Sequence, residues 1–149
     1  MIANYTTTVT VQRSLAEIIE MLAAHGSRKV LIEHGPKGEP MALAFTVKDT
    51  AFRLPIYPIA VQQTLERDGA PPRYRTLDHA NNVAWRVVRD WLRAQLALIE
   101  SGMVALDEIM LPYALTAGGM TALERYREGT LSLDAGVAQV GQCPHDNRS

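Results

Sequence analysis

The stretch NNVAWRVVRDWLRAQLALIES, residues 81–101, predicts one long amphipathic helix, and the rest of the chain is interpreted around it. At about 100° per residue, one side of this helix is apolar. The opposite side carries three arginines at spacings of three and four residues, Arg86, Arg89 and Arg93. The residues of the apolar side are Ala84, Val87, Val88, Trp91, Leu92, Leu98 and Ile99. The apolar side indicates packing within the protein, whereas the arginine row indicates a surface for a partner.

Upstream of this helix, the sequence predicts a strand, a helix and three further strands. Residues 5–11 alternate with period two and are rich in β-branched residues, which is typical of a strand. The SLAE motif that starts at Ser14 has the pattern of a capping box, and the helix behind it is expected to end at Gly26. Turn-rich segments at 35–40 and 48–50 separate three short apolar runs and predict an antiparallel meander. These runs are residues 29–34, 41–47 and 51–56.

The expected fold class is α+β, with a β-α-β-β-β antiparallel sheet unit followed by a helical C-terminal half that contains one long helix. Pro58 suits the first turn of a short helix, and a Pro- and Gly-rich segment at 68–72 separates that helix from the long one. A second capping box, TALE, begins at Thr121. The expected helices of this half are residues 58–67, 79–101, 104–110 and 121–127. We expect one domain over residues 1–128, with an α/β half at 1–57, a helical half at 58–128 and a weakly structured tail at 129–149.

Composition is typical of a globular protein and excludes several classes. The 149 residues are 47% hydrophobic and 21% charged, with a formal net charge of −1. The single cysteine, Cys143, excludes an intramolecular disulfide and favours a reducing compartment. No signal peptide is recognisable, and no apolar run is long enough to cross a membrane. We therefore expect a cytoplasmic protein without membrane association.

The arginine row is the candidate nucleic-acid surface. An Arg-Tyr-Arg loop, Arg73, Tyr74 and Arg75, precedes the long helix, and Trp85 lies next to Arg86 in the sequence. Guanidinium groups bind phosphate in a bidentate manner, and aromatic rings stack on bases. The competing interpretation is a solvated charged surface, because Asp90 is spaced to form intrahelical ion pairs with the arginines.

The apolar side of the same helix is the candidate interface. Gln95 lies between Trp91 and Leu98 on that side, and a buried amide needs hydrogen-bond partners. In a helix–helix interface, such a polar group often fixes the register. These three residues therefore predict pairing with a second copy, unless Gln95 is a core residue that bonds to nearby backbone.

Known catalytic and cofactor motifs are absent from the sequence. It contains no G-x-S-x-G, no Walker A motif and no G-x-G-x-x-G. The four histidines lack metal-ligand spacing, and Cys143 and His145 form one small cluster near the end of the chain. We expect no catalytic residues, no metal and no cofactor.

Three segments carry a resemblance to a known group of proteins. They are NYTT at residues 4–7, AWRVVRDWLRAQLALIESG at 84–102 and LDEIMLPY at 106–113. In this order they resemble a group of small, uncharacterised proteins encoded in bacteriophage and prophage genomes, over about residues 4–128. The resemblance implies DNA metabolism through association with phage replication and recombination functions, and it transfers no catalytic residues.

Two functions are therefore expected. The first is a non-enzymatic, phage-type accessory protein of DNA replication or recombination, which binds single-stranded or duplex DNA in the cytoplasm of the bacterial host. The alternative is a protein–protein interaction module that binds a host or phage protein, as a monomer or as a homodimer, and binds no nucleic acid.

Overall fold

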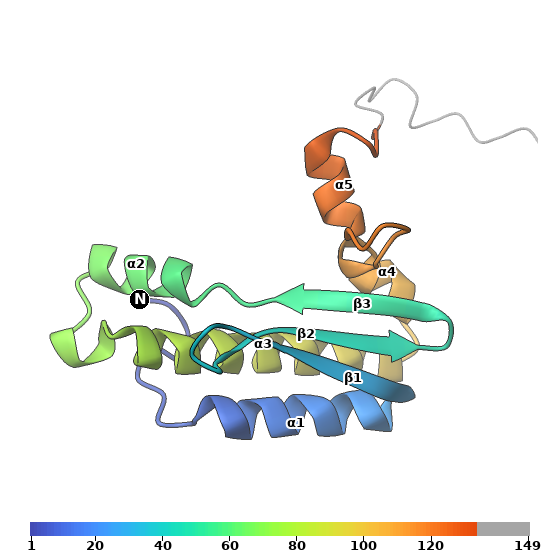
Figure 1. The fold of residues 1–149 in the computed structure, drawn as a ribbon. Helices are drawn as coiled ribbons and strands as arrows, with labels where there is room; N and C mark the ends of the chain where they lie inside the picture. The colour runs from blue at the N-terminus through green and yellow to red at the C-terminus, as the bar shows by residue number, and fades with distance from the viewer. Residues whose placement is uncertain (134–149) are drawn as a thin grey trace, which may run out of the picture.

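An antiparallel three-stranded sheet in the order β1-β2-β3 forms one layer of the protein, and helices cover one of its faces (Figure 1). The computed structural model describes residues 1–133. The strands are β1 (Ser27–His34), β2 (Pro40–Val47) and β3 (Thr50–Pro55). The helices are α1 (Val11–Ala24), α2 (Pro58–Arg67), α3 (Leu77–Glu100), α4 (Leu106–Met110) and α5 (Ala122–Glu128), with short 3₁₀ turns at η1 (Pro72–Tyr74) and η2 (Leu111–Tyr113). The α+β class and the long helix are confirmed.

The meander forms as predicted, because alternate apolar residues of neighbouring strands meet on one face. Phe45 pairs with Phe52, and their rings stack with centroids 5.3 Å apart. Leu43 pairs with Leu54 in the same register, and all four side chains belong to the hydrophobic core. Residues of α1 and α3 complete this core, so both helices pack on the same face of the sheet.

The strand predicted over residues 5–11 is wrong, and the sheet of the described residues has three strands instead of four. Residues 3–6 form a turn, residues 7–10 have no regular secondary structure, and Val11 begins α1, so that polar groups of this segment bond to helices instead of to a neighbouring strand. The Tyr5 carbonyl lies 2.6 Å from Nε2 of His79, and the Val11 N–H donates to Oδ1 of Asn82 at 3.1 Å. Alternation of threonine and valine alone does not produce a strand, because a strand also needs hydrogen bonds to the edge of a neighbouring strand.

The start of α1 also differs from the prediction. The hydroxyl of Thr10 accepts a hydrogen bond from the Arg13 N–H, so Thr10 is the N-cap and the helix begins at Val11. Ser14 lies inside the helix and is fully buried. The predicted end at Gly26 is confirmed by the left-handed backbone of this residue, φ +90°.

The segment between η2 and α5 pairs with the outer edge of β3. The Leu115 N–H donates to the Ala51 carbonyl at 2.8 Å, and Ala114 forms a bridge with Phe52 of β3. The predicted capping box at Thr121 is confirmed, because Thr121 and Glu124 satisfy each other's backbone N–H groups. Helix α5, which it opens, projects away from the sheet (Figure 1).

The buried side of α3 is broader than the predicted apolar stripe. Ala84 and Leu92 are buried as expected, whereas Val87 is partly exposed at the surface. Trp85 and Leu96 are buried although the helical wheel places them beside the arginine row. The reason is that α3 packs against α1, α2 and the sheet, so that apolar contacts surround more than one side of it.

Candidate functional site

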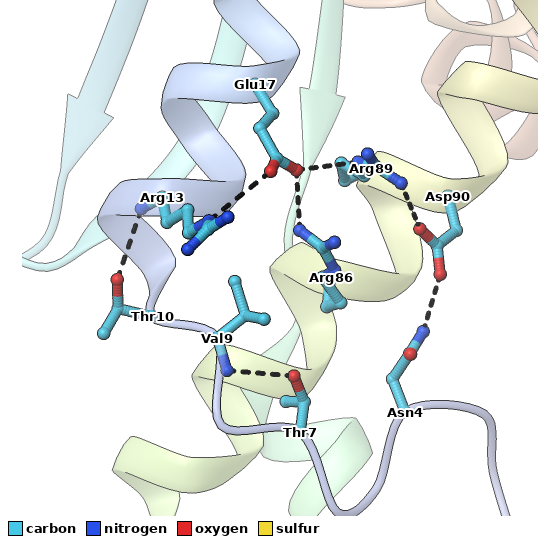
Figure 2. Close-up of polar contacts among 9 residues, drawn as sticks. All are labelled: Asn4, Thr7, Val9, Thr10, Arg13, Glu17, Arg86, Arg89 and Asp90. Atoms are coloured by element: carbon cyan, nitrogen blue, oxygen red, sulfur yellow. Dashed lines mark hydrogen bonds and ion pairs between the residues drawn. The ribbon is translucent and has the colours of Figure 1, made fainter.

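Two of the three arginines in the predicted row, Arg86 and Arg89, form ion pairs within the protein (Figure 2). Nη1 of Arg86 donates to Oε2 of Glu17 at 2.7 Å, which ties α3 to α1. Nε of Arg89 lies 2.8 Å from the same oxygen without hydrogen-bond alignment, so that contact is mainly coulombic. The two arginine side chains are only 18% and 16% exposed. Arg86 and Arg89 therefore hold the helices together and are poorly placed to bind phosphate.

The network continues on both sides of these arginines. Arg13 approaches the Glu17 carboxylate at 3.6 Å, and Nη1 of Arg89 donates to Asp90 at 3.0 Å. Nδ2 of Asn4 donates to the second oxygen of Asp90 at 2.9 Å (Figure 2). The N-terminal segment is thereby fixed to α3, which explains the turn that replaces the predicted strand.

The charges of this network alter the acidity of its carboxylates. Burial acts to raise the pKa of Glu17, but the hydrogen bond from Arg86 and the positive charges of Arg86 and Arg89 outweigh burial, so its pKa is lowered. Burial likewise opposes ionisation of Asp90, and the hydrogen bonds from Asn4 and Arg89 reverse this effect, so its pKa is also lowered. Both carboxylates are therefore charged at neutral pH.

The predicted 73–75 loop is also engaged in internal contacts. The Tyr74 ring packs against Tyr5 and His79, with centroids 5.6 Å and 5.1 Å away. The Arg73 guanidinium lies 4.5 Å above the Tyr74 ring, and Nε of Arg75 donates to the Ala70 carbonyl. Arg73 is exposed, whereas Tyr74 and Arg75 are half-buried.

Two further predicted nucleic-acid contacts differ sharply in exposure. Trp85 is fully buried, and its Nε1 donates to the Pro40 carbonyl at 3.3 Å, so its assignment as a base-stacking residue is wrong. Arg93 is exposed and forms no ion pair with any of residues 1–133. Among the seven predicted contacts, only Arg73 and Arg93 are exposed.

One residue of the predicted interface, Trp91, packs against the chain itself. Trp91 meets the ring of Tyr113 edge to face, with centroids 5.8 Å apart, and both rings pack against the core. Gln95 and Leu98 are half-buried, so Gln95 is not the fully buried amide that the stripe implied. Tyr113 of η2 therefore covers part of the Trp91 ring, and Gln95 and Leu98 keep partly exposed surfaces.

A basic hollow, defined by Gly26, Arg28, Lys29, Thr46, Lys48 and Asp49, lies where β1 begins and β2 turns into β3. Its volume is about 460 Å³. Three cationic side chains line it against one carboxylate, and all three cationic residues are exposed. None of them forms an ion pair with any part of the described chain.

Local backbone geometry brings these cations together. Ser27 pairs with Val47 and Lys29 with Thr46, so Arg28 is an extra residue in a β-bulge. A bulge redirects side chains at a strand end, which places Arg28 and Lys29 on one hollow. Lys48 has a left-handed backbone, φ +53°, in the tight turn opposite.

Sequence reasoning overlooked this hollow although a signal for it existed. The predicted meander, with its loop at 35–40, already places residue 29 near residues 46–48. The bulge at Arg28 had no such signal, since a bulge depends on register and not on composition.

No group of three or more His, Cys, Asp or Glu side chains among residues 1–133 could hold a metal ion. Cys143 and His145 lie outside the described residues. None of the helices in residues 1–133 combines the length and the hydropathy that a transmembrane segment requires.

Comparison of the chain with protein-family models, with curated proteins and with solved structures finds no match. Function must therefore follow from the residues and their geometry.

Proposed function

We propose that this chain is a non-enzymatic protein that binds the phosphate backbone of nucleic acid at the basic hollow. One observation carries the proposal: Arg28, Lys29 and Lys48 surround a single concavity, where they outnumber the one carboxylate of its lining and form no ion pair with any of residues 1–133. Unpaired cations that converge on one hollow suit a polyanion, because each phosphate contact releases condensed counterions.

The lining of the hollow also suggests how nucleic acid would be recognised. It contains no aromatic ring on which a base could stack. Contacts would therefore be made to phosphates and would be largely independent of sequence. Such a role agrees with an accessory protein of phage DNA replication or recombination, in the cytoplasm of a bacterial host.

The α3 surface is the less favourable alternative for the same ligand. A phosphate at Arg86 or Arg89 would have to compete with Glu17, which already binds both guanidinium groups. Breaking a half-buried ion pair leaves an uncompensated charge, which opposes binding there. Only Arg73 and Arg93 could contribute without such a cost.

Binding to labelled single-stranded and duplex oligonucleotides over a salt series tests the proposal. The double variant Lys29→Glu/Lys48→Glu should weaken binding by about tenfold or more at low salt, because two attractive charges become repulsive. The matched control Arg73→Glu/Arg93→Glu reverses two exposed arginines elsewhere and should change the affinity by about twofold or less.

Three results would contradict the proposal. They are the absence of binding by the wild-type protein even at low salt, a loss of affinity confined to the Arg73/Arg93 control, and binding that does not weaken as salt increases.

A further inference from the structure

A second surface of interest lies at the end of the sheet opposite the basic hollow. There a groove of about 490 Å³ is enclosed by the β1–β2 loop and by the first turns of α1, α2 and α3. Figure 1 shows these three helix starts and the loop at the same end of the molecule. Large apolar side chains line the groove from β2, α2 and α3: Met41, Ile59 and Leu77.

These apolar side chains are unusually accessible. Met41 and Leu77 are each 43% exposed and Ile59 is 60% exposed. Tyr57, next to the start of α2, is 65% exposed and borders a second groove of about 370 Å³. Residues of the N-terminal segment, of α2 and of α3 line that second groove, and none of its lining residues is charged. A cluster of exposed apolar side chains is typical of an interaction surface.

The surface combines a projecting ridge with hollows beside it. Tyr57, Pro58 and Ile59 form the ridge, since Tyr57 lines one groove and the other two residues line the other. A ridge and a recess on one surface can fit the same surface of a second copy when the copies are related by a two-fold axis.

Charges in the main groove are complementary in the same way. Lys37 and Glu39 line it from the β1–β2 loop and Asp78 lines it from α3, and the Glu39 carboxylate accepts a hydrogen bond from the Lys37 backbone N–H at 2.8 Å. Neither Lys37 nor Asp78 forms an ion pair with any of residues 1–133. In a dimer with a two-fold axis, Lys37 of each copy can form an ion pair with Asp78 of the other. The two symmetric ion pairs would neutralise four charges.

We infer that this apolar end is the interface of a symmetric homodimer, in which the ridge of each copy packs into the grooves of the other. Exposed apolar area supplies the favourable free energy, and the Lys37–Asp78 pairs fix the orientation. A net charge of −1 offers little repulsion between copies. The inference is independent of nucleic-acid binding, because the basic hollow lies at the opposite end of the sheet.

Sedimentation and light scattering of the full chain over a concentration series test this interface. The wild-type protein should reach twice the mass of one chain. Ile59→Asp should raise the dimer dissociation constant by about tenfold or more. Leu31→Asp is the matched control, because Leu31 is equally exposed but lies on β1, outside the groove lining, and this variant should dimerise as the wild-type does.

Charge exchange tests the two-fold arrangement. Lys37→Glu and Asp78→Lys should each weaken dimerisation by about tenfold, and the double variant should recover within about threefold of the wild-type. Far-ultraviolet circular dichroism on every variant checks that the fold is retained. A monomeric wild-type protein, a dimer indifferent to Ile59→Asp, or a double variant that does not recover would each overturn the inference.

Discussion

Glu17 is a single side chain that neutralises two arginines of another helix. Its carboxylate contacts Arg86 at 2.7 Å and Arg89 at 2.8 Å. Glu17→Gln removes the negative charge and leaves two half-buried guanidinium groups close together. We expect this variant to lose about 1–3 kcal/mol of unfolding free energy, measured by urea denaturation.

Glu20 supplies the control for this prediction on the same helix. It is exposed and forms no ion pair with any of residues 1–133. Glu20→Gln should change stability by about 0.5 kcal/mol or less. Equal effects of the two variants would show that the ion-pair network contributes nothing specific.

Thr10 and Ser14 compare the observed start of α1 with the predicted one. Thr10 caps the helix, so Thr10→Ala should cost about 1 kcal/mol. The Ser14 hydroxyl is buried without a hydrogen-bond partner among the described residues, so Ser14→Ala should be neutral or stabilising by about 1 kcal/mol. Thermal unfolding of both variants measures the two signs. A marked loss of stability in Ser14→Ala would indicate that Ser14, and not Thr10, caps the helix.

At the scale of elements, the contact between α1 and α3 should make stability depend on pH. The pKa values of Glu17 and Asp90 are both lowered in the folded protein. Their contribution to stability is therefore complete above their unfolded pKa values and is lost as the pH falls through the folded ones. We expect the melting temperature to decrease from about pH 4.5 downward.

The Glu17→Gln variant isolates this effect. Calorimetry over the same pH series should show a shallower decrease for the variant, because only Asp90 and the remaining carboxylates still titrate. Identical pH profiles of the two proteins would mean that the α1–α3 ion pairs do not govern acid stability.

Elements were predictable where their signals are local. The three strands of the meander, helix α2 and the Thr121 capping box follow from turn residues, from Pro58 and from capping chemistry that the sequence displays directly. The strand over residues 5–11 failed because its alternation is local whereas pairing is not: Tyr5 and Val11 bond to His79 and Asn82, more than 70 positions away. The pairing of Arg86 and Arg89 could not be predicted for the same reason, since Glu17 lies on another helix.

At the scale of the whole molecule, the proposed nucleic-acid site depends on tertiary structure. Arg28 and Lys29 come from the start of β1, and Lys48 comes from the turn after β2. Antiparallel pairing brings these positions to one end of the sheet, and the bulge at Arg28 completes the hollow. The residue types were visible in the sequence, but their convergence required the register.

The molecule would thus carry its two proposed contacts at opposite ends. Figure 1 shows the β2–β3 turn at one end of the sheet and the starts of α1, α2 and α3 at the other. Residues of the first end line the basic hollow, and residues of the second end line the main groove. A dimer formed at the apolar end would leave both basic hollows accessible. Nucleic-acid affinity per site should therefore be the same in the wild-type protein and in the Ile59→Asp variant.

Titration of the isotopically labelled protein with a short oligonucleotide, followed by backbone amide chemical shifts, tests the central claim most directly. The account predicts that the largest shifts occur at Arg28, Lys29, Lys48 and Asp49, and that added salt reverses them. Shifts concentrated at Arg73 and Arg93, or no shifts at low salt, would contradict it.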